Sequence, residues 1–283
     1  IDRHSFLIDP HEIEKKITQK TRAIIPVHYG GESCDMDAVM EIARMHRLYV
    51  IEDAAHALPA LYKGRMIGTI GDIICFSFYA TKTITTGEGG MINTANSEWA
   101  DRMRRLRLHG ITKDAWNRYS EKGTWQYDVS EPGYKYNMTD IASAIGIEQL
   151  KKSDAMNAMR HEISAKYNNA FKNSELLHTW KVRDDAECAW HLYPVLVNTE
   201  AVNIGRDELI GKLKDAGIGT SVHYIPMYRF SCFGGSGSSA SGFPGCEYMF
   251  ARQVSLPIYP GMTESETGYV ADTFLSILKE NRR

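Results

Sequence analysis

The hydrophobic residues in the first half of the chain follow two different spacings. Short apolar runs occupy residues 23–28, 48–51 and 73–78, and each has the length of a buried strand. Between the first two runs, apolar residues from Met36 to Met45 recur at helical spacing. Strands that alternate with helices are typical of an α/β layer with a mostly parallel sheet. We therefore predict such a sheet, with ligands bound at the carboxyl ends of its strands.

The sequence pattern of the second half predicts a smaller α/β unit that follows a long helical stretch in the chain. The helical pattern begins after Thr139, breaks near residues 151–154 and continues to about Phe171. The elements predicted after it are a strand at 192–197, a helix at 206–216, a strand at 220–223 and a closing helix at 264–279. We divide the chain accordingly into a large domain, residues 1–155, and a smaller C-terminal domain, residues 156–283.

Composition mainly excludes classes of partner. A chain of 283 residues with 43% hydrophobic and 24% charged residues is ordinary for a soluble globular protein. A net charge of -2 gives no reason to expect a nucleic-acid partner, and no apolar run is long enough to cross a membrane. The five cysteines are scattered and form no Cys-x-x-Cys pair. We therefore expect neither disulfides nor a metal site, and we assign the protein to the cytoplasm.

Lys82 and Asp53 are the strongest candidates for chemistry. Lys82 follows the apolar run 73–78 and precedes an uncharged Thr- and Gly-rich stretch, whereas Asp53 ends the run that begins at residue 48. A lysine amine forms a Schiff base with an aldehyde, and a carboxylate can hold a pyridinium nitrogen protonated, which together describe a pyridoxal phosphate site. The alternatives are a surface lysine and a helix N-cap. The functional interpretation is favoured because Glu52 and Asp53, adjacent at a buried strand end, would be costly without partners.

Other residues near these two fit the same site. Ser77, five residues before Lys82, could donate its hydroxyl to a phosphate. His56 could reach the phenolic oxygen of the cofactor, although a hydrogen-bonded structural histidine is an equally natural interpretation. The glycines in residues 87–90 predict a tight turn that lets the backbone pass close to the loop of Lys82.

A series of ordered motifs from Asp9 to about Thr263 resembles the DegT/DnrJ/EryC1/StrS sugar aminotransferases, which are fold-type I pyridoxal phosphate enzymes. The motifs that carry the resemblance are Pro26-Val27-His28-Tyr29-Gly30, Glu52-Asp53-Ala54-Ala55-His56-Ala57, the block from Phe76 to Gly90, Leu106-Arg107-Leu108-His109-Gly110, Tyr134-Lys135-Tyr136-Asn137-Met138-Thr139-Asp140, Trp190-His191-Leu192-Tyr193, Gly217-Ile218-Gly219-Thr220-Ser221-Val222-His223-Tyr224 and Leu256-Pro257-Ile258-Tyr259-Pro260.

The resemblance implies a role at the cofactor for four of these residues. Lys82 matches the Schiff-base lysine of the family, Asp53 the aspartate at the pyridine nitrogen, and Ser77 a phosphate ligand. His56 stands where the family has Gln or His beside the cofactor ring. Some relatives replace the lysine with histidine and become dehydratases, so Lys82 argues against that activity.

The resemblance also implies a homodimer with shared active sites. Asn137 matches an asparagine that reaches the cofactor phosphate of the neighbouring subunit, although the sequence alone allows a helix cap before Thr139. His223 and Tyr224 lie where the family lines its nucleotide-sugar pocket. Members of the family have a segment before the position of Ile1, with a phosphate-binding helix start and an aromatic residue that stacks on the cofactor. We therefore expect an N-terminally incomplete large domain, weak cofactor retention and poor solubility.

The function that these observations predict is transfer of an amino group from glutamate to a nucleotide-linked keto sugar. The stretch 105–119, with His109-Gly110 and Asp114-Ala115-Trp116, most resembles the branch that aminates C4 of UDP-linked 4-keto-6-deoxy sugars. A pyridoxal phosphate-dependent sugar dehydratase or epimerase is one alternative. A non-catalytic fold-type I regulator or partner subunit is another.

Overall fold

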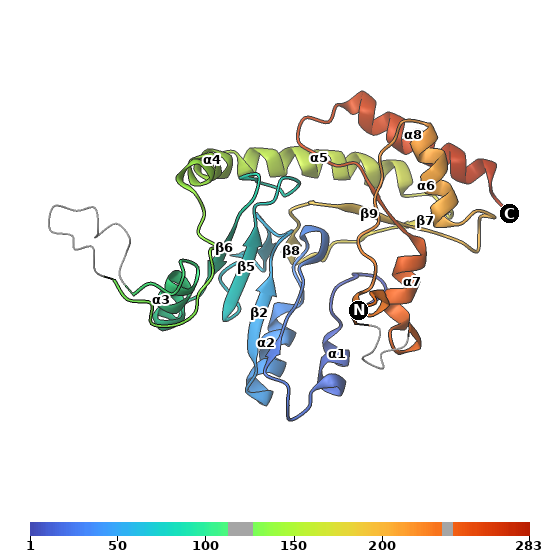
Figure 1. Ribbon diagram of the computed structural model, residues 1–283. Helices are drawn as coiled ribbons and strands as arrows, with labels where there is room; N and C mark the ends of the chain where they lie inside the picture. Colours follow the sequence, from blue (N-terminus) through green and yellow to red (C-terminus); the bar gives the residue numbers. More distant parts are fainter. Residues whose placement is uncertain (113–126, 234–239) are drawn as a thin grey trace.

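A four-stranded sheet forms the centre of the first half of the molecule (Figure 1). The computed structural model describes residues 1–112, 127–233 and 240–283. The strands of this sheet, in spatial order, are β1 (Ala23–Ile24), β2 (Tyr49–Asp53), β5 (Ile73–Ser77) and β6 (Gly90–Asn93). Strands β1, β2 and β5 are parallel, and β6 is an antiparallel edge strand. The predicted α/β architecture with a mostly parallel sheet is confirmed. The antiparallel strand β6 is a further strand that the sequence analysis did not predict.

The pairing of β2 with β5 brings two predicted site residues to the same edge of the sheet. Asp53, the last residue of β2, lies opposite Cys75 in the neighbouring strand. Strand β5 ends two residues later, at Ser77. Because both strands run in the same direction, Asp53 and Ser77 lie at the carboxyl ends, where ligands of such sheets bind.

Helix α2 (Met36–His46) packs its apolar face on this sheet and agrees with the helix predicted at 36–45. The carboxylate of Asp35 caps its first turn by accepting a hydrogen bond from the backbone N–H of Ala38. The other helical segments of the first half are α1 (Pro10–Ile13), η1 (Glu14–Lys16), η2 (Tyr29–Gly31) and α3 (Ser97–Leu106). A small antiparallel sheet links the halves of the chain, with strands β4 (Arg65–Met66), β3 (Leu61–Tyr62) and β8 (Ala186–Glu187).

The second half contains a long helix pair and a second sheet. Helices α4 (Asp140–Leu150) and α5 (Ser153–Phe171) are separated where the sequence predicted the break. The second sheet is antiparallel, in the order β10 (Gln253–Leu256), β9 (Tyr193–Val197) and β7 (Leu177–Thr179). The remaining segments are α6 (Arg206–Asp215), η4 (Met227–Arg229), η5 (Ala240–Gly242), α7 (Pro244–Arg252) and α8 (Glu264–Glu280). The strand predicted at 192–197 is confirmed as β9. The helices predicted at 206–216 and 264–279 are confirmed as α6 and α8.

The strand predicted at 220–223 is wrong. Only Ser221 forms a bridge, to Ser255 of β10. The next backbone N–H in reach of β10, that of His223, donates instead to the side chain of Gln253, at 2.9 Å. A side-chain acceptor has therefore replaced the strand ladder, and the chain leaves the sheet at this point.

Aromatic side chains hold the second half together. Tyr167 and Phe171 on α5 stack with their ring centroids 5.9 Å apart, and Phe171 lies 5.7 Å from Phe274 on α8. Tyr193 of β9 closes the cluster, 4.8 Å from Tyr167. Each such side chain contributes about 1.5–3 kcal/mol when fully buried. In Figure 1, α5 runs along the top of the molecule between the sheets and α8. Within the described residues, no helix combines the length and the apolar character that crossing a bilayer requires.

Candidate active site

Lys82 lies in a loop that is held at several points after the end of β5. Its backbone N–H donates to the carbonyl oxygen of Tyr79 at 3.0 Å. The backbone N–H of Thr86 donates to the carbonyl oxygen of Phe78 at 2.9 Å. The hydroxyl of Thr83 donates to the carbonyl oxygen of Leu58. The side chain of Lys82 is half-buried, and burial lowers the pKa of its amine, while the negative charge of Asp53 partly opposes this shift. A lysine in this setting is more easily deprotonated than one at the surface.

The glycines that follow Lys82 let the loop fold tightly. Gly87 has a φ of 80°, which favours glycine. A Cβ on Gly89 would collide with the Thr86 side chain, and one on Gly90 would lie 2.7 Å from the carbonyl oxygen of Phe76. The turn predicted from these glycines is confirmed.

Asp53 is the last residue of β2 and lies beside β5, the strand that precedes the loop of Lys82. One carboxylate oxygen accepts a hydrogen bond from the N–H of Ala55 at 3.1 Å, which is the turn bond that the N-cap interpretation predicts. The other oxygen makes no hydrogen bond to a residue that the structure describes. Burial and the negative charge of Asp53 raise the pKa of Tyr224, and the same charge partly opposes the lowering of the pKa of Lys82 by burial. The turn bond and a ligand contact can therefore coexist.

The neighbouring Glu52 is fully buried and has the partners that its burial requires. One carboxylate oxygen accepts from Nε2 of His28 at 2.9 Å, and the other accepts from the backbone N–H of Gly71. Nδ1 of His28 accepts from the N–H of Cys34 at 3.1 Å, so the ring proton is on Nε2. This buried pair fixes the end of β2, directly before Asp53.

His56 is buried and uses both ring nitrogens. Nδ1 accepts from the backbone N–H of Gly30 at 3.2 Å, and Nε2 lies 3.0 Å from the hydroxyl oxygen of Tyr224. Burial, assisted by the positive charge of Lys82, lowers the pKa of His56 to about 3. The ring is therefore neutral at physiological pH.

His223 and Tyr224 approach the same place from the segment before η4. The carbonyl oxygen of His223 accepts from the hydroxyl of Tyr29 at 2.9 Å. Nδ1 of His223 lies 2.8 Å from the hydroxyl oxygen of Ser255 on β10. Burial lowers the pKa of His223, and burial together with the charge of Asp53 raises that of Tyr224. The structure thus brings these two residues to His56, three residues after the end of β2 at Asp53.

The structure adds His191, to which the sequence analysis gave no role. Its ring centroid lies 4.4 Å from that of His56, and its buried Nδ1 makes no hydrogen bond within the described part of the chain. Burial lowers the pKa of His191 to about 2. Arg160 on α5 holds the backbone beside it, donating to the carbonyl oxygens of Trp190 at 3.1 Å and of Ile258 at 2.8 Å. The motif at 190–193 was the available signal, but a histidine among apolar residues does not by itself indicate a site.

Ser77 and Asn137 are less closely tied to this cluster. Ser77 is half-buried at the end of β5, and its hydroxyl oxygen accepts from the N–H of Tyr79 at 3.4 Å. The side-chain oxygen of Asn137 accepts from the amine of Lys135 at 2.6 Å. The cap of α4 is Thr139, so the interpretation of Asn137 as a helix cap is wrong. No hydrogen bond joins Asn137 to Lys82 or Asp53 among the described residues.

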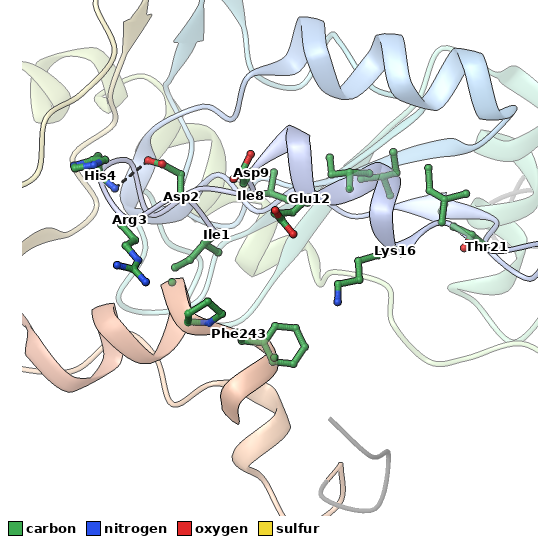
Figure 2. A pocket seen from close by; sticks show the side chains of 17 residues that line it. Ile1, Asp2, Arg3, His4, Ile8, Asp9, Glu12, Lys16, Thr21 and Phe243 are labelled. Carbon is green, nitrogen blue, oxygen red and sulfur yellow. Dashed lines mark hydrogen bonds between the residues drawn. The ribbon is translucent and has the colours of Figure 1, made fainter. Parts of the chain in front are cut away.

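A cavity of about 610 Å³ lies elsewhere, between residues 1–24 and the segment 242–245 (Figure 2). None of the candidate site residues lines it.

Of the described residues, no group of three or more His, Cys, Asp or Glu side chains is arranged to hold a metal ion. The part of the stretch 105–119 that follows residue 112, including Asp114-Ala115-Trp116, lies outside the described residues.

Comparison with known proteins gives one consistent family. Residues 1–275 match the DegT/DnrJ/EryC1/StrS aminotransferase family. The chain is 51% identical over 283 residues to the uncharacterised protein MJ1066 of Methanocaldococcus jannaschii, and the match covers 100% of this chain and 73% of that protein. It is 46% identical over 281 residues to the spore coat polysaccharide biosynthesis protein SpsC of Bacillus subtilis, with 99% of this chain and 72% of SpsC covered.

Solved structures give the same result. Spr1654 of Streptococcus pneumoniae, assigned as a sugar aminotransferase, superposes in its PMP form with a TM-score of 0.92 at 31% identity, covering 99% of this chain and 75% of that one. Its PLP form gives a TM-score of 0.90 at 30% identity, with 99% and 74% covered. PseC of Helicobacter pylori, an aminotransferase involved in the biosynthesis of pseudoaminic acid, gives 0.90 at 26% identity, with 99% and 72% covered.

Proposed function

The chain belongs to the DegT/DnrJ/EryC1/StrS aminotransferase family, and from this we infer that it is a sugar aminotransferase with pyridoxal 5′-phosphate as its cofactor. The family and the fold-type I architecture predicted from the sequence are confirmed. The observation that carries the function is the placement of Asp53 at the end of β2, beside β5, with the loop of Lys82 following β5 and hydrogen-bonded through Thr83 to Leu58. The alternative functions of a dehydratase, an epimerase or a non-catalytic regulator have less support than the aminotransferase function, because the family model and the similar structures are described as aminotransferases.

The residues present fit this cofactor. When bound, pyridoxal phosphate supplies an aldehyde that reacts with amines and a ring that withdraws electrons. Lys82 is the amine in the site, and its lowered pKa favours the uncharged, nucleophilic form. After the amino donor displaces it, the same amine can carry a proton to or from the substrate carbon. Asp53 is the acidic group facing it and would keep the ring nitrogen protonated.

Ser77 and Asn137 would hold the cofactor phosphate, Ser77 within its own subunit and Asn137 from a neighbouring one. Helix α4, which begins three residues after Asn137, supports this arrangement. Its apolar side chains Ile141, Ile145, Ile147 and Leu150 are all exposed. Such a surface is suited to a partner, and we assign it to a second copy of this chain in a homodimer.

The substrate we propose is a nucleotide-linked sugar with a ketone at C4, a UDP-4-keto-6-deoxy sugar, and the amino donor is glutamate. His223 and Tyr224, half-buried and exposed respectively, would contact the sugar. The similarity to SpsC and PseC, whose names refer to polysaccharide and pseudoaminic acid biosynthesis, supports a sugar as the amino acceptor.

Replacement of Lys82 tests this function directly. Lys82→Ala should abolish both the borohydride-reducible attachment of the cofactor and amino transfer from glutamate to a panel of nucleotide keto sugars. The matched control is Lys63→Ala, because Lys63 is an exposed lysine that is paired with Asp37. A reduced cofactor–peptide adduct that persists on another lysine, identified by mass spectrometry, would contradict the assignment.

A further inference from the structure

The hydrogen bonds of His56 fix which of its nitrogens carries the proton. Gly30 can only donate through its backbone N–H, so Nδ1 of His56 must be the acceptor. The ring is neutral, and its single proton is therefore on Nε2. That nitrogen faces the hydroxyl oxygen of Tyr224 at 3.0 Å.

This tautomer also fixes the role of the Tyr224 hydroxyl. Because Nε2–H of His56 donates to the hydroxyl oxygen, the proton of Tyr224 points away from His56 and is available to another acceptor. The raised pKa of Tyr224 keeps this proton in place at neutral pH. The side chain is 54% exposed, so a ligand can reach it. Its partner His56 is three residues after Asp53, the last residue of β2, which puts the hydroxyl at the carboxyl end of this strand.

We propose that Tyr224 donates a hydrogen bond to the carbonyl oxygen of the keto sugar, and that His56 is a positioning residue that holds Tyr224 in this donor role. The inference rests on the proposed function for the identity of the ligand. His191 contributes by packing against the His56 ring, 4.4 Å away between centroids. Both ring nitrogens of His56 are engaged within the protein, as the alternative interpretation of a hydrogen-bonded structural histidine predicts. A bond from His56 to the phenolic oxygen of the cofactor would require Nε2–H to leave Tyr224.

Kinetics of the two half-reactions test the proposal. Tyr224→Phe and His56→Phe should each lower kcat/KM for the keto sugar by about 10-fold, the effect of one lost hydrogen bond. The double variant should lose no more than either single one, because the two residues act through the same bond. His56→Gln, which keeps an N–H donor for Tyr224, should restore most of the rate. In each of these variants the loss with the keto sugar should exceed any loss in the reaction with glutamate.

The matched control is Tyr269→Phe on α8. Tyr269 is also 54% exposed and also makes one hydrogen bond through its hydroxyl, to the carbonyl oxygen of Ala216. It should behave like the wild type. The proposal is overturned if the losses at His56 and Tyr224 are additive, or if His56→Phe slows the glutamate reaction as much as the reaction with the keto sugar.

A substrate-free measurement separates this proposal from the proposed function. ¹⁵N NMR of the histidine rings should show His56 protonated at Nε2, with a shift that changes in Tyr224→Phe. Protonation at Nδ1 would overturn the positioning role of His56. If the wild type shows the Nε2–H form but aminates no keto sugar, the proposed function and the sugar as ligand are both wrong, while the His56–Tyr224 contact stands.

Discussion

Asp53 combines a local turn bond with a negative charge that adds to the effect of burial in raising the pKa of Tyr224 and partly opposes the effect of burial in lowering the pKa of Lys82. The two contributions can be separated because asparagine keeps an oxygen for the N–H of Ala55 but has no negative charge. In the site, the charge would keep the ring nitrogen of the cofactor protonated, and the turn bond only shapes the chain after β2.

Asp53→Asn should therefore leave the fold intact and lower the transamination rate by about 10²- to 10⁴-fold, because the proton on the cofactor ring is no longer held. The measurement is single-turnover kinetics with glutamate, alongside circular dichroism. Asp35→Asn is the matched control, since Asp35 is a helix-capping aspartate outside the site. Turnover near that of the wild type in Asp53→Asn would show that Asp53 is only a structural turn residue.

At the scale of elements, the loop of Lys82 is attached to the segment that follows His56. The attachment is the hydrogen bond from the Thr83 hydroxyl to the carbonyl oxygen of Leu58, two residues after His56. This hydrogen bond connects the segment after β5, which carries Lys82, to the segment after β2, which follows Asp53.

Thr83→Val keeps the shape of the side chain and removes this bond. We expect cofactor binding to weaken by about fivefold, corresponding to about 1 kcal/mol for a lost hydrogen bond. Equilibrium dialysis against pyridoxal phosphate gives the dissociation constant. Thr69→Val is a matched control, because the Thr69 hydroxyl donates to the carbonyl oxygen of Met66 in an exposed turn. Equal affinities in the two variants would mean that the Thr83 bond does not organise the loop.

At the scale of the whole molecule, the proposed homodimer makes a distinctive prediction. If Asn137 serves the site of the neighbouring subunit, each active site needs Lys82 from one chain and Asn137 from the other. A mixed dimer of Lys82→Ala and Asn137→Ala chains would then contain one intact site and one doubly defective site.

Mixing the two variants after reversible dissociation should therefore restore activity to about a quarter of the wild-type value, since about half of the dimers are mixed and each has one intact site. Activity assays before and after mixing measure the recovery, and analytical ultracentrifugation checks the dimer. The unmixed variants are the controls. If no activity returns although mixed dimers form, Asn137 acts within its own subunit or not at all.

The sequence by itself determined the elements whose patterns are local. The apolar runs predicted β2 and β5, helical spacing predicted α2, and the break between α4 and α5 was visible in the chain. Because parallel strands end at the same edge, the strand assignments were enough to place Asp53 and Ser77 near each other. The ordered motifs identified the family and, with it, the cofactor.

Only the tertiary structure decided the contacts between distant segments. His56 and Tyr224 are 168 residues apart in the chain, and no spacing rule relates them, yet their side chains lie within hydrogen-bond distance. The prediction of a strand at 220–223 was wrong for the same reason, because the side chain of Gln253 in β10 accepts the hydrogen bond from the N–H of His223. His191 became a site residue only through its packing on His56. Periodicity records which face of an element is buried, whereas the partner of each polar atom depends on which elements pack together.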